Sequence, residues 1–277
     1  MSTNENKGKK AEVTALQAIS AEDRKDWISL AFVQAGICVC VPAFLLGALL
    51  AEAMPIWPAI ISGSLGYLIV VVGMVATGMI GCDLGLASCT CCQAGFGKSG
   101  ARFIVSTIFA VNMIGWFGIQ NGVCGEAFSN AMLAMTGWDI PVVVSNTIWG
   151  IIMLLTAVYG VHALEKLDKI SIPLLMIIMC YGTFLAFKVY GTGNLNDEGT
   201  VQSMSFMSGV ALSFNFTAVG TITGPDYTRF QKSRKDTVKS VFYGVFPMGV
   251  ITLIMGIVLT KLSLIHISEP TRRTPIS

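Results

Sequence analysis

The sequence predicts an all-α membrane protein with about seven transmembrane helices. Of its 277 residues 53% are hydrophobic and only 12% charged, with a mean hydropathy of +0.69, whereas soluble domains are about a quarter charged. A helix needs roughly 20 apolar residues to cross the hydrocarbon core. Blocks of this kind fall near 28–50, 57–80, 103–135, 141–161, 170–190, 203–224 and 240–260.

The basic residues gather on one side of the predicted membrane. The N-terminal arm and the second, fourth and sixth loops hold fourteen Lys and Arg, whereas the intervening loops hold only Lys188. The positive-inside rule therefore predicts a cytoplasmic arm over residues 1–27, which has no signal-peptide core. The formal net charge of +2 is too small to indicate a nucleic-acid partner.

The first predicted span, 28–50, contains a proline at position 42. Proline inside a helix removes a backbone hydrogen bond and clashes with the preceding turn, so we expect freed carbonyls near Cys38. A harmless kink is the alternative.

The second span, 57–80, is rich in glycine. Small residues allow close helix packing, which we expect at Gly63, Gly66, Gly73, Gly78 and Gly81.

The third span, 103–135, places Trp116 deep in the membrane with Gln120 one turn later on the same face. An aromatic surface beside an amide suits a planar heteroaromatic ligand, because the ring stacks and the amide bonds its edge. The alternative is a tryptophan packed between helices, with Gly118 and Gly122 as a contact face. Glu126, further along, is a candidate as an intramembrane carboxylate, and the alternative is a side chain that reaches the membrane interface.

The sixth predicted span carries the sequence around which the chain is organised. Polar residues and glycines fill the centre of Ser203 to Phe230, which closes on Gly224-Pro225-Asp226. Non-helical backbone at membrane depth is tolerated only where it is buried in protein or lines a cavity. We therefore expect this helix to break part-way across the membrane. Two broken helices, five spans apart, are typical of inverted-repeat transporters.

The remaining motifs do not indicate a specific function. The run Cys89-Thr90-Cys91-Cys92 suggests a soft metal site but lacks a second cluster, so reduced thiols are expected. The stretch Gly95–Gly100 lacks the strand and spacing of a phosphate-binding loop. His162 is alone in the loop that precedes a fifth span beginning at Pro173. With no His/Asp/Glu cluster in the spans, we do not expect an enzyme.

The chain changes character near its end. Residues 262–277 resemble translated sequencing-adapter sequence and are expected to be non-native. The transmembrane domain is therefore placed at 28–261.

Several of these stretches resemble the nucleobase–cation symporter family, closest to bacterial cytosine and purine–cytosine permeases. The matching stretches are Phe32–Gly36, Gly115–Gly118, Tyr159-Gly160 with the connector Leu164–Pro173, Gly220–Thr223 and Asp226–Phe230. They occur in family order from about residue 24 to 260. The resemblance implies a five-plus-five inverted-repeat fold that is incomplete here, with about seven of twelve transmembrane helices.

The resemblance also implies roles for individual residues. Trp116 would stack on the base, Gln120 would bond its edge, and Phe216 would cover its other face. The backbone from Asn215 through Thr217 to Ala218 would complete the polar contacts. Ala218 stands where some members have a serine, which leaves the exact base open.

The cation site is the other implied site. The carbonyls of Gly36 and Val39 would hold the transported cation, with no other metal and no cofactor. Further ligands come from the family's eighth span, before which this chain ends, so we expect a fragment that does not transport.

The expected function is secondary active symport of a nucleobase, cytosine or a purine, driven by Na⁺ or H⁺. The protein would be a multi-pass monomer of the cytoplasmic membrane, with the lipid bilayer, a small-molecule substrate and the coupling cation as its partners. The alternatives are an allantoin- or hydantoin-type heterocycle carrier and, in another class, a seven-span receptor or sensor.

Overall fold

The computed structural model describes residues 16–158, 161–191, 195 and 204–263. These residues form helices and one isolated bridge, between Lys25 and Gln231. The elements are η1 (Ala21–Asp23), α1 (Trp27–Cys38), α2 (Val41–Ala53), α3 (Ile56–Leu84), α4 (Ser88–Cys91), α5 (Gln93–Gly100), η2 (Ala101–Val105), α6 (Ser106–Thr136), α7 (Val142–Val158), α8 (Val161–Tyr190), α9 (Phe206–Thr217), α10 (Val219–Thr228) and α11 (Arg234–Ser263). The predicted all-α membrane fold is confirmed.

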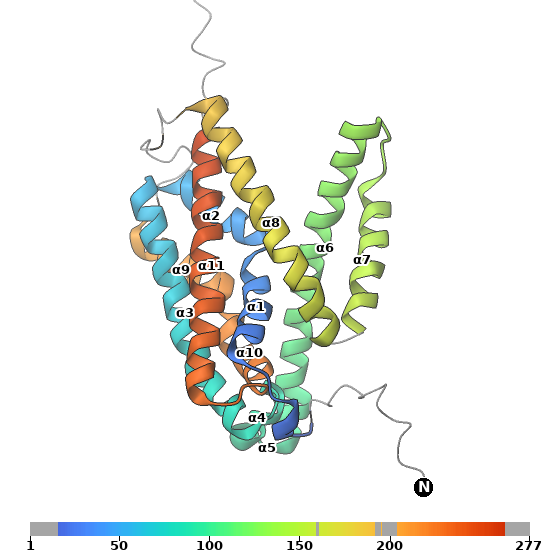
Figure 1. The fold of residues 1–277 in the computed structure, drawn as a ribbon, viewed down its shortest axis with the longest axis vertical. Helices are drawn as coiled ribbons and strands as arrows, with labels where there is room; N and C mark the ends of the chain where they lie inside the picture. The colour runs from blue at the N-terminus through green and yellow to red at the C-terminus, as the bar shows by residue number, and fades with distance from the viewer. Residues whose placement is uncertain (1–15, 159–160, 192–194, 196–203, 264–277) are drawn as a thin grey trace, which may run out of the picture.

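The core is a bundle formed by α1, α2, α3, α9, α10 and α11 (Figure 1). The most apolar stretches of α3 and α11 are each 44% buried, against 6% for the helix that contains α6. Leu50, Tyr67, Leu253 and Ile257 are fully buried where α2, α3 and α11 meet. The long helices α3 and α11 therefore form the centre of the bundle.

The glycines of α3 form its contact with α9 and α10, as predicted. A Cβ built at Gly66 would lie 2.5 Å from the Cβ of Ser213, and one at Gly81 would lie 2.5 Å from the Cα of Pro225. A side chain at either position has no room. The glycines thus let two apolar helices approach until their backbones nearly touch.

Hydroxyl groups complete this contact. Ser213 donates to the Gly63 carbonyl at 2.7 Å, and Thr228 donates to the Gly78 carbonyl at 2.7 Å. Both pairs are 150 residues apart in the chain, so the two helices advance together and run parallel.

This parallel register bears on how many times the described part of the chain crosses the membrane. Two parallel spans must be separated by an odd number of crossings, and α6, α7 and α8 lie between α3 and α9. By length and composition five helices qualify as spans, with the bent pair α1–α2 as a sixth. The remaining helix, α7, has 17 residues, which is at the lower limit for a span. Because α6 and α8 both cross, α7 must cross too, which supports seven spans.

The helices α6 and α7 form a separate arm beside the bundle (Figure 1). Ser145 of α7 donates to the Gly125 carbonyl of α6 at 2.8 Å, and Ser129 donates to the Ile140 carbonyl at 2.6 Å. Contacts between this arm and the bundle are sparse. The bundle and the arm are therefore two units with few contacts between them.

Residues 19–26 form hydrogen bonds to the end of the bundle at which α3 and α10 end. The Ile19 amide donates to the Gly85 carbonyl at 3.0 Å and the Lys25 amide to the Phe230 carbonyl at 2.7 Å. Arg24 donates to the Gln231 carbonyl at 2.9 Å. Since these contacts join α1, α3 and α10, they hold the bundle together as one unit.

Three sequence predictions about connections were wrong. The predicted loop 82–102 contains α4, α5 and η2, with its bend at Gly97 (φ 69°). The polar connector that holds His162 is part of α8, which begins at Val161, and Pro173 lies inside that helix rather than at its start. Helix formation pairs backbone groups near the membrane that a loop would leave to water, which explains both extensions. The predicted tail, 262–277, lies almost entirely outside the described residues.

Candidate ligand cavity at the break of the first span

The first span is broken where the sequence predicts it. The helix α1 ends at Cys38 and α2 begins at Val41, with a bend of 53° between them. Val39 (ψ 74°) and Cys40 (φ −144°, ψ 157°) leave helical geometry. An α-helix that ends at Cys38 leaves the carbonyls of its last turn without intrahelical donors. The Ala35 carbonyl is the exception, because it still accepts the Val39 amide at 2.9 Å.

The break predicted for the sixth span is much smaller than expected. Only Ala218 interrupts the helix, and it keeps right-handed dihedral angles (φ −55°, ψ −31°). The helix continues through Pro225 to Thr228. Its polar residues serve another purpose, because Thr217 donates to the Ser213 carbonyl at 3.0 Å and Thr223 to the Val219 carbonyl at 3.0 Å. The threonines therefore bond to helix carbonyls and do not mark unwound backbone.

A cavity of about 330 Å³ lies beside the break in the first span. Its walls come from the end of α1 and the broken segment, from α3, α9, α10 and α11 in the bundle, and from α6 of the arm. The volume is in the range of small-molecule sites, roughly 300–1,000 Å³. The residues that line it are Gly36, Ile37, Cys38, Cys40, Tyr67, Val70, Met74, Met113, Trp116, Phe117, Gln120, Phe216, Thr217, Val219, Gly220, Thr223, Tyr227 and Val245.

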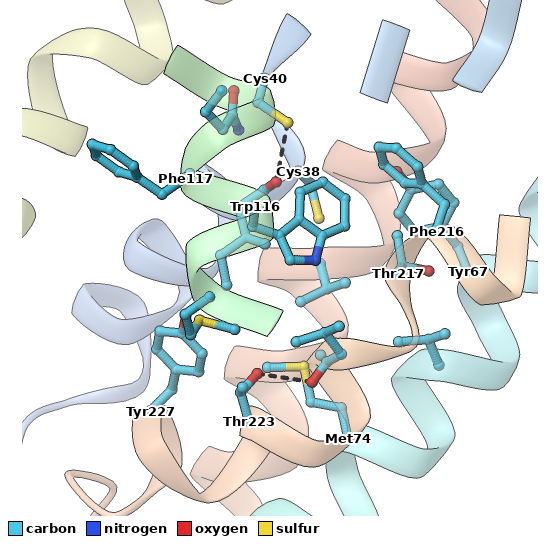
Figure 2. Close-up of a pocket in the computed structure, with 18 residues that line it drawn as sticks. Cys38, Cys40, Tyr67, Met74, Trp116, Phe117, Phe216, Thr217, Thr223 and Tyr227 are labelled. Carbon is cyan, nitrogen blue, oxygen red and sulfur yellow. Dashed lines mark hydrogen bonds between the residues drawn. The ribbon is translucent and has the colours of Figure 1, made fainter. Parts of the chain in front are cut away.

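Trp116, Gln120, Phe216 and Thr217 all line this cavity. The indole of Trp116 points into it (Figure 2) and meets the ring of Phe216 edge to face, with 5.2 Å between centroids and 86° between ring planes. The two rings therefore contact each other and do not lie parallel on either side of an open slot. For a flat ligand to stack between the two rings, the side chain of Phe216 must rotate away from Trp116.

The alternative packing expected for this part of α6 is present only in part: Trp116 contacts Phe216 of α9, whereas the glycines make no such contact among the described residues. A Cβ at Gly118 or Gly122 would meet no atom of the described residues within 4 Å, so these glycines do not form a helix contact face there. Trp116 is half-buried at the cavity wall, and Glu126 is exposed on the same helix.

Of the remaining predicted site residues, Gly36 lines the cavity, whereas Asn215, Ala218 and Val39 do not. Asn215 is exposed, and Ala218 lies at the interruption between α9 and α10 without lining the cavity. Of the two residues expected at a cation, Gly36 lines the cavity, whereas the side chain of Val39 is buried beside Ala35 and Ile172.

Sequence reasoning missed several lining residues. Tyr67 is fully buried on α3 and lines the cavity, as do Cys40 and Thr223. A buried tyrosine in a glycine-rich span is a signal that could have indicated Tyr67, because its hydroxyl needs a polar environment. For Cys40 the signal is its place two residues before Pro42 in the broken segment.

The cysteines near α4 are not grouped with further metal-ligating side chains among the described residues. No group of three or more His, Cys, Asp and Glu able to hold a metal ion occurs in the described part of the chain. All eight cysteines are free thiols. Burial raises the pKa of the Cys89 and Cys91 thiols above the usual range, which keeps them protonated and weakly reactive.

The helices and the cavity together define a class of protein. This is a multi-pass membrane protein in which a ligand-sized cavity lies between a compact bundle and a separate helical arm, next to a broken helix. Broken helices beside midplane cavities are typical of secondary transporters.

Comparison with known proteins identifies the family. The sequence profile described as "Permease for cytosine/purines, uracil, thiamine, allantoin" matches residues 19–276. The cytosine permease of Escherichia coli K12 is 27% identical over 237 residues, which cover 84% of this chain and 54% of that protein. The purine-uracil permease NCS1 of Arabidopsis thaliana is 24% identical, over 91% of this chain and 49% of that protein.

A solved structure shows the same fold. Mhp1, described as a nucleobase-cation-symport-1 family transporter in a closed conformation with bromovinylhydantoin bound, aligns with a TM-score of 0.73 at 18% identity. The alignment covers 91% of this chain and 56% of Mhp1. The chain belongs to this family of cytosine, purine, uracil, thiamine and allantoin permeases, which are transport proteins and not enzymes. It spans about half the length of the curated relatives it matches.

Proposed function

We propose that this chain forms the substrate-binding part of a secondary active transporter that carries a nucleobase, cytosine or a purine, across the cytoplasmic membrane by cation-coupled symport. The observation that carries the proposal is the cavity itself, in which Trp116 and Gln120 share one wall beside the break in the first span. An indole face binds a flat ring and an amide bonds its edge. The cytosine and purine-uracil permeases among its relatives support this substrate class.

The coupling cation is proposed at the break of the first span. Carbonyl groups that lose their helical partners are suitable ligands for a hard cation such as Na⁺, and Gly36 lies in this last turn of α1. Proton coupling is the other possibility. The position of the cavity between the bundle and the arm supports alternating access by relative movement of these two units.

Two further statements belong to the proposal. The N-terminus lies in the cytoplasm, because the basic residues are concentrated in the arm and in the second, fourth and sixth connections. The protein acts as a monomer. Reporter fusions at residue 1 and in the connection 136–141 test the orientation, and an extracellular residue 1 contradicts it.

The experiment that tests the substrate is equilibrium binding of radiolabelled cytosine to the chain in lipid nanodiscs. Adenine, uracil and allantoin serve as competitors, and Na⁺ and pH are varied separately. We expect cytosine or a purine to compete best and affinity to rise with Na⁺ or with protons. If none of these compounds binds, the proposal is contradicted.

A second substrate class has one specific observation in its favour. Mhp1, which has the same fold, is described with bromovinylhydantoin bound, and allantoin is among the compounds named for the family. These ligands also carry a small ring with amide groups. A carrier of allantoin- or hydantoin-type heterocycles is therefore the alternative, and it predicts that allantoin displaces cytosine at the lowest concentration.

A further inference from the structure

The beginnings of α1 and α11 lie side by side at one end of the bundle (Figure 1). A Cβ built at Gly244 of α11 would lie 2.6 Å from the Ala31 carbonyl oxygen of α1, so the two helices are in direct contact. Beside this contact, the ring centroids of Trp27 and Tyr243 are 5.9 Å apart, with 47° between the ring planes. The aromatic pair therefore joins the first turn of α1 to the third turn of α11.

Lys239 extends this aromatic pair. Its Nζ lies 5.9 Å from the centroid of the Trp27 ring, which is within the range of a cation–π contact. Lys235, Lys239 and Tyr243 follow one another at intervals of four residues, so they form a row along one face of α11. Two ammonium groups in the first two turns are thus followed by an aromatic ring in the third.

The two lysines of this row are available to an anion from outside the chain. Lys235 and Lys239 are exposed, and neither forms an ion pair in the described part of the chain. The carboxylates next to them in sequence already accept hydrogen bonds from other groups. Asp26 accepts from a backbone amide at 3.3 Å, and Asp236 accepts from a serine hydroxyl at 2.9 Å.

Exposed aromatic rings continue the face of α11 beyond the lysines. Phe242 is 38% and Tyr243 57% exposed, and Phe242 stacks on Phe246 one turn further, with 5.5 Å between centroids. Tryptophan and tyrosine prefer the depth at which headgroups meet hydrocarbon, and lysine side chains extend from there toward water. The face therefore changes from cationic to aromatic within about three turns. The interfacial aromatic cluster is defined as Trp27, Phe242 and Tyr243.

We propose that this face of α1 and α11 binds an acidic phospholipid. The lipid phosphate lies at Lys235 and Lys239, and the glycerol and upper acyl chains pack on the interfacial aromatic cluster. A free phosphate ion would contact only the lysines, whereas a lipid matches both the charge and the exposed rings. Basic pockets between transmembrane helices on the cytoplasmic side are known to bind acidic headgroups. The inference does not depend on the transported compound, and it uses the cytoplasmic orientation proposed above for this end.

The test is the selectivity of the purified chain for two phospholipids that differ in headgroup charge. Native mass spectrometry measures the dissociation constants of dioleoyl phosphatidylglycerol, which is acidic, and dioleoyl phosphatidylcholine, which has the same acyl chains and no net charge. The variants are Lys239→Gln, Lys239→Arg and Tyr243→Ala. Lys188→Gln is the matched control, because Lys188 is an exposed lysine in the last turn of α8, far from the start of α11 (Figure 1).

The expected readout is the ratio of the two dissociation constants. The unmodified chain and Lys188→Gln bind phosphatidylglycerol more tightly than phosphatidylcholine. In Lys239→Gln this preference falls about fivefold, the effect of one lysine at an acidic membrane surface. Lys239→Arg retains the preference, because the guanidinium group carries the same charge and also stacks on aromatic rings. Tyr243→Ala binds both lipids more weakly and leaves their ratio unchanged, because the ring contacts parts that the two lipids share.

Three outcomes would overturn the proposal. The first is equal affinity of the unmodified chain for the two lipids. The second is an equal loss of preference in Lys188→Gln and Lys239→Gln, because the selectivity would then reflect net charge and not this face. The third comes from inorganic phosphate as an additional probe: if it binds as tightly as phosphatidylglycerol, the lysines hold a free anion and the lipid assignment is wrong. If Lys239→Gln does not fold, Lys235→Gln takes its place with the same expected result.

Discussion

The indole of Trp116 and the ring of Phe216 meet edge to face at 5.2 Å, so two helices from different units of the molecule touch through aromatic side chains across the cavity. A ligand that stacks on Trp116 must replace this contact. We therefore expect Phe216→Leu to weaken cytosine binding only about three- to tenfold, the effect of one aromatic pair. Titration in nanodiscs measures it, and a complete loss of binding shows that Phe216 is the principal contact.

Replacement of Pro42 tests whether the break of the first span is needed. Pro42 cannot donate an amide proton, and Pro42→Ala restores that donor for the Cys38 carbonyl. Proline disfavours a continuous helix by about 3 kcal/mol, so the variant shifts the segment toward a straight helix. Cytosine affinity should fall while the melting temperature stays equal or rises.

The matched control for this experiment is Pro173→Ala. Pro173 also lies inside a helix, α8, but it does not line the cavity. We expect its affinity for cytosine to match that of the unmodified chain. If Pro42→Ala binds equally well, the break is not required for the ligand site.

The contact between α2 and α11 tolerates no added side chain at Gly47. A Cβ there would lie 2.5 Å from the Leu253 carbonyl oxygen and 2.9 Å from the Ile257 nitrogen, both backbone atoms. Overpacking of this kind costs about 1–3 kcal/mol, so Gly47→Ala should unfold at lower temperature. Gly182→Ala is the control, since a Cβ at Gly182 meets nothing within 4 Å in the described residues. Equal melting temperatures for the two variants contradict the packing shown here.

Asp226 holds the short helix α4 against the end of α10. Its Oδ1 accepts the Ser88 amide at 3.0 Å. Burial raises the pKa of the neighbouring Cys89 thiol, and the charge of Asp226 adds to this. Maleimide reacts with the thiolate, so Cys89 should react slowly at neutral pH and faster as pH rises through its elevated pKa.

Variants at Asp226 separate the charge from the hydrogen bond. Asp226→Asn keeps an acceptor for the Ser88 amide and removes the charge, whereas Asp226→Ala removes both. In a chain that retains only Cys89, labelling should be faster in Asp226→Asn and fastest in Asp226→Ala. Equal rates in all three proteins would mean that Asp226 neither shields the thiol nor anchors α4.

The sequence predicts the helical membrane fold well because composition and periodicity determine it locally. The glycines of the second span correctly indicate close packing, and Pro42 correctly indicates the break of the first span, since both effects act through the backbone of the residue itself. Connections were predicted less well. The polar residues at 82–102 and 161–169 are compatible with a loop and with a helix. Which of the two forms depends on packing in the folded structure.

The sixth span shows a different limit. Its threonines and glycines fit both an unwound segment and a helix that bonds to its neighbour. Thr221 and Thr228 lie in a helix and donate hydrogen bonds to carbonyl groups of the neighbouring helix α3. The sequence alone does not reveal that these carbonyl groups lie beside them. Trp116 and Gln120 could be placed in one site by their spacing, whereas Asn215 could not be excluded, because its orientation depends on the register of α9 against α3.

The central claim is that the face of Trp116 binds a flat heterocycle. The direct test is the dissociation constant of cytosine for Trp116→Ala, compared with Trp138→Ala, which removes an exposed tryptophan that does not line the cavity. Stacking of a base on an aromatic side chain contributes about 1–3 kcal/mol, so Trp116→Ala should bind at least fivefold more weakly, with Trp138→Ala unchanged. Equal affinity in both folded variants would contradict the account.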